Sequence, residues 1–246
     1  MSTTAPRSDH LRSSKRHLAR GVRKASDLAR LDGYAPGLAH RIRRWEATYV
    51  MDDRASLHEF WSQPQPEGNL PTGYIGQLQR SEMLVKLIAD VPKGARILEV
   101  GCNVGRNLAF LHDSGWTQVA GVEISPHAVD LLRATYPQLA DRPIYLGPAE
   151  DVLPSLDGPY DLVFTMAVLE HIHPDSTAVF DQIGRLATSL LCIEPMENHV
   201  SHRQFPHDIR ALFTERGFRC ESEIAVADFL DRDMGNYAAW RFQKIR

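Results

Sequence analysis

The sequence has few cysteines and no long hydrophobic run. Its three cysteines, Cys102, Cys192 and Cys220, are far apart and form no Cys-x-x-Cys pair, so neither a disulfide framework nor a thiolate zinc site is expected. No segment approaches the ~18 apolar residues that a membrane span needs. The first residues, MSTTAPRSDHLRSSKR, lack the apolar core of a secretory signal. These absences predict a cytoplasmic protein outside the membrane.

Charge is distributed unevenly along the chain. The 246 residues carry a net charge of −3, but residues 1–30 contain eight Lys or Arg and only two Asp. We interpret residues 1–33 as a basic tail, partly disordered or helical, rather than as an organellar transit peptide. The length and the 43% of hydrophobic residues fit one large globular domain with an appendage.

Residues 34–92 have the pattern of a helical segment. Apolar side chains recur at helical spacing in residues 38–49, 57–61 and 78–88, and a loop with three prolines separates the second group from the third. The character of the chain changes after Lys93-Gly94, where short apolar strands begin to alternate with helices. The strands are expected at residues 96–100, 118–123, 143–146, 160–166, 189–194, 218–226 and 237–245. This alternation predicts an α/β domain over residues 93–246, with a mainly parallel sheet covered on both faces.

The segment ILEVGCNVGRN, residues 97–107, runs from a strand into a glycine-bearing turn and then into a helix. Glycine lets the backbone approach a ligand closely, and the start of a helix offers free N–H groups. The dinucleotide-binding fingerprint needs glycine at its first, third and sixth positions. Counting from Gly101, the third and sixth positions hold Asn103 and Arg106, so an NAD or FAD site is not expected.

The other arrangement that competes for this segment is acidic-x-Gly-x-Gly-x-Gly. Glu99, Gly101 and Gly105 match it, with Asn103 at the middle glycine. The segment therefore resembles motif I of the class I S-adenosylmethionine-dependent methyltransferases. This resemblance implies a Rossmann-like, doubly wound sheet of seven strands, mostly parallel with the last strand antiparallel, and S-adenosylmethionine as the cofactor, with S-adenosylhomocysteine as its product.

The resemblance continues downstream and covers about residues 94–246. Glu123 ends the second strand, where the family places an acid against the ribose hydroxyls, and Gly147-Pro-Ala-Glu150 follows the third strand, where the family contacts adenine. Val168-Leu-Glu-His171 matches the family's Val-Leu-Glu-His stretch after strand four. The cofactor-binding residues implied by these matches, together with candidates from the preceding helical segment, are Glu99, Gly101, Cys102, Asn103, Gly105, Glu123, Ile124, Ala149, Glu150, Met166, Tyr74 and Arg80.

Two residues depart from the family pattern. Asn103 replaces a glycine, but Asn tolerates a left-handed backbone better than most residues, so the turn is expected to survive. Pro148 stands where an Asp would accept the adenine amine, so adenine recognition must use backbone groups or a neighbour such as Glu150.

Three histidines are candidates for the catalytic base. His171 follows strand four, and His199 and His202 follow strand five, at the edge of the sheet where α/β folds bind ligands. The alternatives are a structural role for His171 and a solvated loop for the other two. His199-x-x-His202 has no third ligand at a suitable spacing, so no metal is expected.

Residues 34–92 are expected to form a helical cap or lid over the acceptor site, because such a segment is usual in small-molecule members of the family. The expected partner is therefore a small-molecule acceptor, bound by a monomer or a homodimer. Nucleic acid is not expected, since the Asn/Asp-Pro-Pro-aromatic run of base-methylating enzymes is absent and residues 165–171 read TMAVLEH instead. The same absence favours O-methylation over N-methylation. The alternatives are an RNA, protein or peptide methyltransferase, or a catalytically inactive binding module with the same fold.

Overall fold

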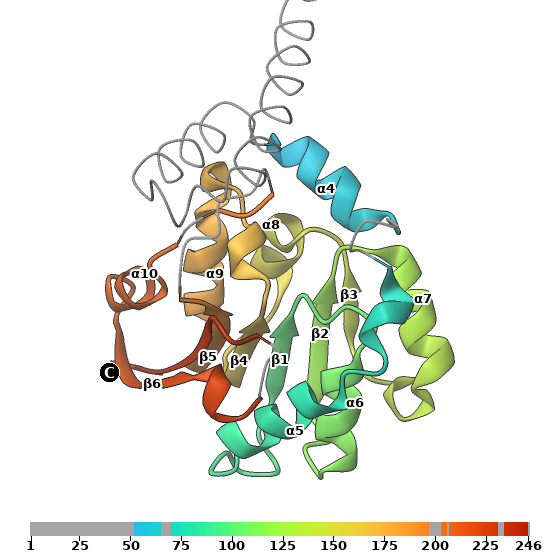
Figure 1. Ribbon diagram of the computed structural model, residues 1–246, viewed down its shortest axis with the longest axis horizontal. Helices are drawn as coiled ribbons and strands as arrows, with labels where there is room; N and C mark the ends of the chain where they lie inside the picture. The colour runs from blue at the N-terminus through green and yellow to red at the C-terminus, as the bar shows by residue number, and fades with distance from the viewer. Residues whose placement is uncertain (1–51, 65–69, 197–202, 206, 231–233, 246) are drawn as a thin grey trace, which may run out of the picture.

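The computed structural model describes residues 52–64, 70–196, 203–205, 207–230 and 234–245. Their centre is a seven-stranded sheet in the order β3-β2-β1-β4-β5-β7-β6, with helices on both of its faces (Figure 1). The strands are β1 (Ile97–Val100), β2 (Val119–Glu123), β3 (Ile144–Leu146), β4 (Tyr160–Met166), β5 (Ala187–Pro195), β6 (Phe218–Ala225) and β7 (Tyr237–Lys244).

The strand directions confirm the sheet that the sequence predicted. β3, β2, β1, β4 and β5 are parallel, whereas β7 lies between β5 and β6 and is antiparallel to both. The last strand of the chain is therefore the antiparallel one, as expected for a Rossmann-like, doubly wound sheet. The carboxyl ends of the five parallel strands share one edge, which is where open α/β folds bind ligands.

Some of the helices begin at a capping side chain. Ser125, with a proline after it, caps α7 (Pro126–Thr135) and accepts a hydrogen bond from the amide of Ala128, as the sequence predicted. The helices are α4 (Arg54–Ser62), α5 (Leu78–Leu87), α6 (Arg106–Asp113), α7 (Pro126–Thr135), α8 (Ala149–Val152), α9 (Ala178–Leu186) and α10 (Ile209–Thr214). The short 3-10 helices are η1 (Pro71–Tyr74), η2 (Pro137–Leu139), η3 (Leu153–Ser155), η4 (Leu169–His171), η5 (Pro174–Ser176) and η6 (Val226–Asp228). None of the helices in the described ranges has the length and apolar character of a membrane span.

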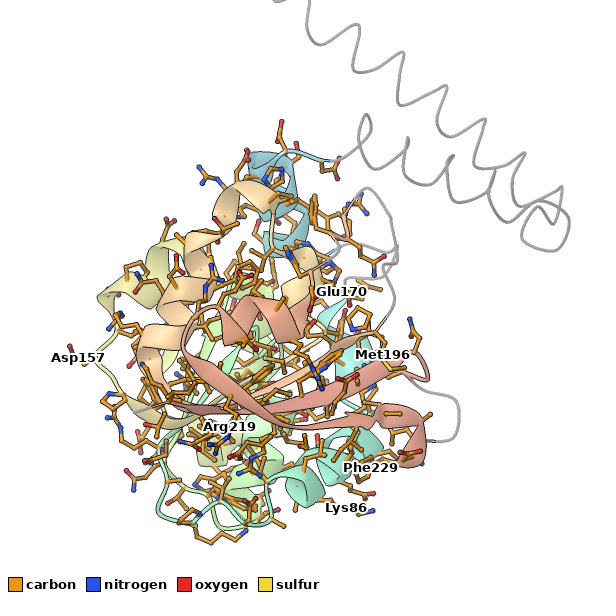
Figure 2. All side chains as sticks on the ribbon, turned by 90° about the vertical axis from the view of Figure 1, so that its left-hand side faces the viewer. Lys86, Asp157, Glu170, Met196, Arg219 and Phe229 are labelled. Atoms are coloured by element: carbon orange, nitrogen blue, oxygen red, sulfur yellow. The ribbon has the colours of Figure 1, made fainter. Side chains whose placement is uncertain are left out.

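Side chains of alternate strand residues form two apolar layers, one on each face of the sheet, and Figure 2 shows them filling the space between sheet and helices. Leu98 and Val163 belong to the layer under α9 and α10, whereas Ile97 and Leu162 belong to the layer under α5, α6 and η2. This burial on both faces is typical of a parallel sheet and explains why its strands are almost continuously apolar.

The described parts of residues 34–92 pack in different ways. α5 supplies Met83, Leu84 and Ile88 to the same apolar layer as β1 and α6, so this helix is built into the core of the sheet domain. α4 instead lies near α8, above the carboxyl edge of the sheet (Figure 1). The domain boundary near residue 93 and the lid over residues 34–92 remain predictions.

Candidate functional site

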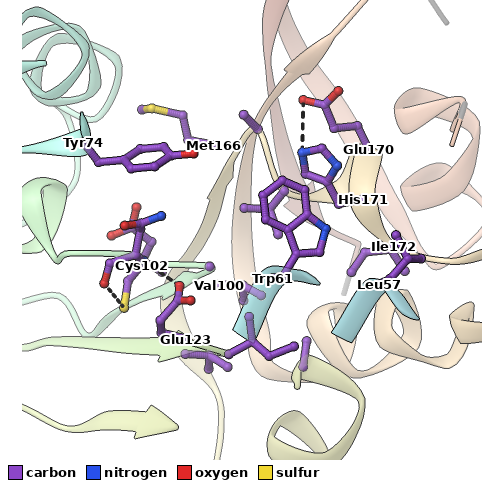
Figure 3. Close-up of a pocket in the computed structure, with 18 of the residues that line it drawn as sticks. Leu57, Trp61, Tyr74, Val100, Cys102, Glu123, Met166, Glu170, His171 and Ile172 are labelled. Carbon is purple, nitrogen blue, oxygen red and sulfur yellow. Dashed lines mark hydrogen bonds and ion pairs between the residues drawn. The ribbon is translucent and has the colours of Figure 1, made fainter. Parts of the chain in front are cut away.

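A cavity of about 390 Å³ opens at the carboxyl ends of the central strands. Its walls come from the ends of β1, β2 and β4, from the starts of α6 and α8, from η1, and from the inner side of α4. Figure 3 shows Tyr74 and Glu123 on one side of this space and Trp61, His171 and Glu170 on the other. A volume within the ~300–1,000 Å³ usual for small-molecule sites makes this cavity the candidate functional site.

The glycine-bearing turn after β1 forms one wall of the cavity. Gly101 and Gly105 have positive φ angles of 76° and 73°, and Asn103 has a φ of 48°. The expected left-handed conformation of Asn103 is confirmed, and its side-chain oxygen accepts a hydrogen bond from the amide of Val104 (2.8 Å). A Cβ on Gly101 would lie 2.5 Å from a methyl of Val168, so the turn after β1 packs directly on the turn after β4.

Glu99 is buried, and one of its carboxylate oxygens has no partner. Its Oε1 accepts a hydrogen bond from the Asn107 amide (2.8 Å), whereas Oε2 has no hydrogen-bond partner among the described residues. Burial raises the pKa of Glu99 to about 8, against the opposing effects of the Asn107 hydrogen bond and the Arg106 charge. An unpaired buried carboxylate oxygen in a cavity wall suits a ligand that carries a cationic donor group.

Glu123, at the end of β2, joins two elements of the site. Its two carboxylate oxygens accept hydrogen bonds from the backbone amides of Asn103 (2.7 Å) and Ser125 (2.8 Å). Burial raises the pKa of Glu123, although these amides oppose the shift. Each oxygen keeps a further lone pair, so the side chain that fixes the glycine turn also has acceptor capacity for a ligand.

Residues after β3 close the cavity beneath α4. Ala149 and Glu150 line it from the start of α8, and Pro148 precedes them without a side-chain cap, as its lack of a polar group predicts. Glu150 Oε1 lies 3.1 Å from Nε2 of His58 on α4. This contact links α4 to the part of the sheet domain that the sequence assigned to adenine.

A buried arginine organises the opposite end of the cavity. Arg106, at the first position of α6, donates hydrogen bonds to the backbone oxygen of Tyr74 (3.1 Å) and to the side chains of Gln77 (3.0 Å) and Ser81 (3.1 Å). Tyr74 and Arg80, two of the candidate residues, line the cavity beside it, and burial raises the pKa of Tyr74. Sequence reasoning missed Arg106, although a cation in the first turn of a helix opposes the helix dipole and signals another role.

His171, in η4, lies against the ring of Trp61 from α4, with ring centroids 4.3 Å apart. Its Nδ1 is 2.8 Å from the backbone oxygen of Arg203, and because a carbonyl only accepts, Nδ1 must carry a proton. Burial lowers the pKa of His171, although the nearby Glu170 opposes this shift. The neutral ring therefore presents the lone pair of Nε2, the form that a general base needs.

Glu170 is a second polar residue of this wall, and sequence reasoning missed it. Its carboxylate accepts hydrogen bonds from the Tyr237 hydroxyl (2.6 Å) and the Gln204 amide (2.5 Å), and its Oε1 lies 3.9 Å from His171 Nε2. Burial and the Glu170 carboxylate raise the pKa of Tyr237, so this hydroxyl keeps its proton. Tyr237 is 67 positions away in sequence, so no local pattern could have identified the pair.

Glu194, at the end of β5, holds the turn that carries these residues. Its buried carboxylate accepts hydrogen bonds from the Thr165 hydroxyl (2.8 Å) and from the backbone amides of Val168 (3.1 Å) and Leu169 (3.1 Å). Within this turn Ala167 has a φ of 57°, an uncommon conformation for a residue other than glycine. Burial raises the pKa of Glu194 to about 8. The Glu194 carboxylate thus stabilises the strained turn after β4.

The structure gathers most of the predicted residues around this one cavity. Of the candidate cofactor residues, Gly105 does not line it; Gly105 directly precedes α6 and packs near Leu132 instead. Of the three candidate bases, His171 lines it, whereas His199 and His202 lie outside the described residues. Within the part of the chain that the structure describes, no three potential metal ligands come together. The predicted residues that line the cavity are Tyr74, Arg80, Glu99, Gly101, Cys102, Asn103, Glu123, Ile124, Ala149, Glu150, Met166 and His171.

Solved structures with this fold include several methyltransferases. The magnesium protoporphyrin IX methyltransferase of Synechocystis, solved with bound S-adenosylmethionine, is 21% identical with a TM-score of 0.60, over 79% of this chain and 98% of that chain. A TehB-like S-adenosylmethionine-dependent methyltransferase of Corynebacterium glutamicum is 17% identical with a TM-score of 0.56, over 78% of this chain and 100% of that one. A candidate RNA methyltransferase of Pyrococcus horikoshii is 16% identical with a TM-score of 0.52, over 76% and 89%. At these identities the likeness establishes the fold alone.

The sequence itself matches a known family over more than half of its length. The model of the methyltransferase domain family matches residues 77–223, a range that contains β1 to β5 and all of the cavity residues contributed by the carboxyl ends of the parallel strands. The resemblance drawn from Glu99, Gly101, Gly105 and the elements that follow them is thereby confirmed. The chain belongs to the methyltransferase domain family and is a methyltransferase with the class I fold.

Proposed function

We propose that this protein transfers a methyl group from S-adenosylmethionine to a small-molecule acceptor, with His171 as the general base. The observation that carries the proposal is that one cavity holds both the buried carboxylates of Glu99 and Glu123 and the neutral imidazole of His171. A donor held by the two carboxylates would therefore share one cavity with a base.

The residues at the first end fit the donor. The unpartnered Oε2 of Glu99 is placed for an ammonium group, and the remaining lone pairs of Glu123 for the two ribose hydroxyls. Ile124 and Ala149 offer apolar contact for adenine, and Glu150 is the neighbouring polar group that replaces the missing Asp at Pro148. When bound, S-adenosylmethionine supplies a methyl group that is already activated on a sulfonium.

The residues of the second end then orient the acceptor and manage its proton. Orientation within a closed site contributes up to roughly 7–11 kcal/mol in the best intramolecular cases. His171 Nε2 accepts the proton that the acceptor loses, while the Arg203 carbonyl holds the ring in the required tautomer. Leu57 and Trp61 of α4 cover this end with apolar surface, which is how a lid excludes water.

The proposal of a small acceptor rests on the wall formed by α4. Arg54, Leu57, His58 and Trp61 all line the cavity from this helix, so α4 covers space that a bulky polymer substrate would need. An acidic chain beyond residue 30 also disfavours a nucleic acid, whose binding depends on phosphate contacts. These observations support a small molecule over RNA.

Calorimetry with S-adenosylmethionine and S-adenosylhomocysteine tests the proposed function. We expect both to bind the wild-type protein, and a variant at an exposed ion pair far from the cavity, Glu223→Gln, to bind them equally well. Methyl transfer is then measured as S-adenosylhomocysteine formed in the presence of candidate acceptors. An absence of detectable binding heat for either compound would refute the enzyme proposal and leave a binding module with a methyltransferase fold.

A further inference from the structure

The part of the cavity beside His171, where we place the methyl acceptor, contains two atoms that can each accept a hydrogen bond, with no proton between them. Nε2 of His171 and Oε1 of Glu170 lie 3.9 Å apart, and both residues line the cavity. This distance is too long for a hydrogen bond between them. The Arg203 carbonyl fixes the proton of His171 on the other ring nitrogen, so Nε2 faces the carboxylate with its lone pair.

The proton donors around Glu170 are already directed at its carboxylate. The Tyr237 hydroxyl donates to Oε1 at 2.6 Å and the Gln204 amide donates to Oε2 at 2.5 Å, so both hold the carboxylate in place. Oε1 retains a second lone pair. A ligand group that enters between Glu170 and His171 therefore meets two acceptors and must bring the hydrogens itself.

We propose that the methyl acceptor is a primary amine, held by one N–H on Nε2 of His171 and the other on Oε1 of Glu170. This inference rests on the proposed function and specifies its substrate class. It also reverses the preference for an oxygen acceptor, which was based on the absence of the Asn/Asp-Pro-Pro-aromatic run. Here the pair Glu170-His171 supplies the two acceptor atoms from a different part of the same loop.

The spacing of the two atoms matches a single nitrogen. A nitrogen about 2.9 Å from each of two atoms that are 3.9 Å apart sees them at an angle of about 85°. Each N–H of a tetrahedral amine then deviates from its acceptor by only about 12°, well within the preferred range of hydrogen-bond angles. With both N–H bonds directed at this wall, the nitrogen lone pair points away from it, back into the cavity toward the donor end.

A hydroxyl group fits the same place less well. It has one proton, so it donates a hydrogen bond to either Nε2 or Oε1. The lone pairs of its own oxygen then face the other of these two atoms, which stays unpaired. A site built around two acceptors discriminates against a ligand that lacks one of the hydrogens, because a buried polar atom then stays unpaired. Trp61, whose ring lies over His171, adds an aromatic face that favours the positive charge that develops on an amine nitrogen as it is methylated.

The reaction balances with these residues alone and the donor. The amine binds as the free base, after its third proton has gone to solvent, and its nitrogen lone pair forms the new bond to the methyl carbon. The carbon–sulfur bond breaks and its electron pair stays on sulfur, which becomes a neutral thioether. The nitrogen is now a secondary ammonium, and it gives one proton to Nε2 of His171, from which the proton passes to solvent. The product amine has a single N–H, so we expect one methyl group to be added and not two.

Matched pairs of amine and alcohol test the inference by binding. The probes are benzylamine against benzyl alcohol, and 2-phenylethylamine against 2-phenylethanol, titrated by calorimetry into protein saturated with S-adenosylhomocysteine. We expect each amine to bind roughly 5- to 100-fold more tightly than its alcohol. Equal or tighter binding of the alcohols, or no binding of either member of both pairs, would overturn the inference.

Two variants separate the proposed contacts from general attraction of a cation. Glu170→Gln and His171→Gln each remove or reverse one acceptor, so each should reduce the amine-to-alcohol preference by about tenfold while alcohol binding stays within about twofold. Glu223→Gln, which removes an exposed carboxylate on β6, should leave the preference unchanged. Thermal unfolding checks that the variants fold, and the wild-type comparison stands even if one does not. A loss of amine and alcohol binding by the same factor would count against the inference.

The outcome also distinguishes this inference from the proposed function. If S-adenosylhomocysteine does not bind to the wild-type protein, the methyltransferase proposal itself fails. If it binds and the alcohols are preferred, only the amine inference fails. Mass spectrometry of an amine that is turned over gives a further check, because a dimethylated main product contradicts the two N–H contacts.

Discussion

Binding of S-adenosylhomocysteine is expected to release a proton from Glu99 and therefore to strengthen as the pH rises from about 6 to about 8. In the ligand-free protein, burial raises the pKa of Glu99 to about 8, so the carboxyl group is mostly protonated at neutral pH. The ammonium of the ligand favours the ionised form once it lies beside the unpartnered Oε2. The carboxyl group therefore loses its proton when the ligand binds.

The size of the effect follows from the two pKa values. We take about 8 for the free protein and the ordinary value of 4.5 for the complex. The association constant then rises about ninefold between pH 6 and 7 and about fivefold between pH 7 and 8, and it levels off above that. The total change of roughly 50-fold lies well within the range of calorimetry.

Calorimetry in buffers of different ionisation enthalpy counts the protons released. The variant Glu99→Gln should show no release from this site, and its titration removes the contribution of the ligand's own amino group. Glu194→Gln is the matched control, because burial gives Glu194 a similar pKa of about 8 but its carboxylate does not line the cavity. The reasoning is refuted if wild-type affinity varies with pH no more than that of Glu99→Gln, or if Glu194→Gln abolishes the proton release.

Four further predictions follow from the site. Glu123→Ala should weaken S-adenosylhomocysteine binding by about 1.5–3 kcal/mol through lost hydrogen bonds to the ribose, and unchanged affinity in calorimetry would remove this assignment. Gly101→Ala should lower both stability and affinity, because a φ of 76° is strained for alanine and the new Cβ would lie 2.5 Å from a methyl of Val168. Gly94→Ala, where nothing lies within 4 Å, is the control in thermal unfolding. Glu194→Ala should reduce the free energy of unfolding by about 2–4 kcal/mol, since three donors, two of them buried, lose their acceptor. A loss below about 0.5 kcal/mol in urea titration, as for a surface substitution, would contradict the assigned role. Because the folded-state pKa values of Glu99 and Glu194 are raised from 4.5 to about 8, the folded protein binds more protons than the unfolded chain. The unfolding free energy of the ligand-free protein should therefore fall as pH rises through this window, by up to about 1.4 kcal/mol per pH unit for each group; the absence of such a fall would show that the two groups are ionised throughout.

The fold could be predicted from sequence because its signals are local. Each strand is a short apolar run bounded by turns, and parallel strands buried on both faces need no more than that. All seven strands lie within two residues of their expected ends; the largest difference is at the start of β5, at Ala187, which follows directly on the last residue of α9, Leu186. The single sheet of seven strands with an antiparallel last strand could not come from periodicity, since pairing joins residues far apart, and it came from the family resemblance.

The residues proposed to bind the methyl donor were predictable for the same reason, whereas those proposed to bind the methyl acceptor were not. Gly101, Asn103 and Glu123 stand at fixed offsets from strand ends, so a motif finds them. The carboxylate of Glu170 accepts a hydrogen bond from Tyr237 of the last strand, and this contact forms only because β7 lies beside β5. Glu194 likewise lies 26 positions from the Val168 amide that it holds. Contacts of this kind are set by tertiary packing, which a single sequence does not encode locally.

The contact between Gly101 and Val168 limits how this protein can change its acceptor. A bulkier or shifted turn after β4 would push against the turn after β1. Altering the β4 turn to admit a new methyl acceptor would therefore also disturb the turn that we propose binds the methyl donor. Leu57 and Trp61 line the same cavity from α4, a helix that lies outside the sheet and does not pack on the Gly101 turn through this contact. Diversification of the acceptor, in nature or in the laboratory, is therefore directed to α4, while the β4 turn stays fixed.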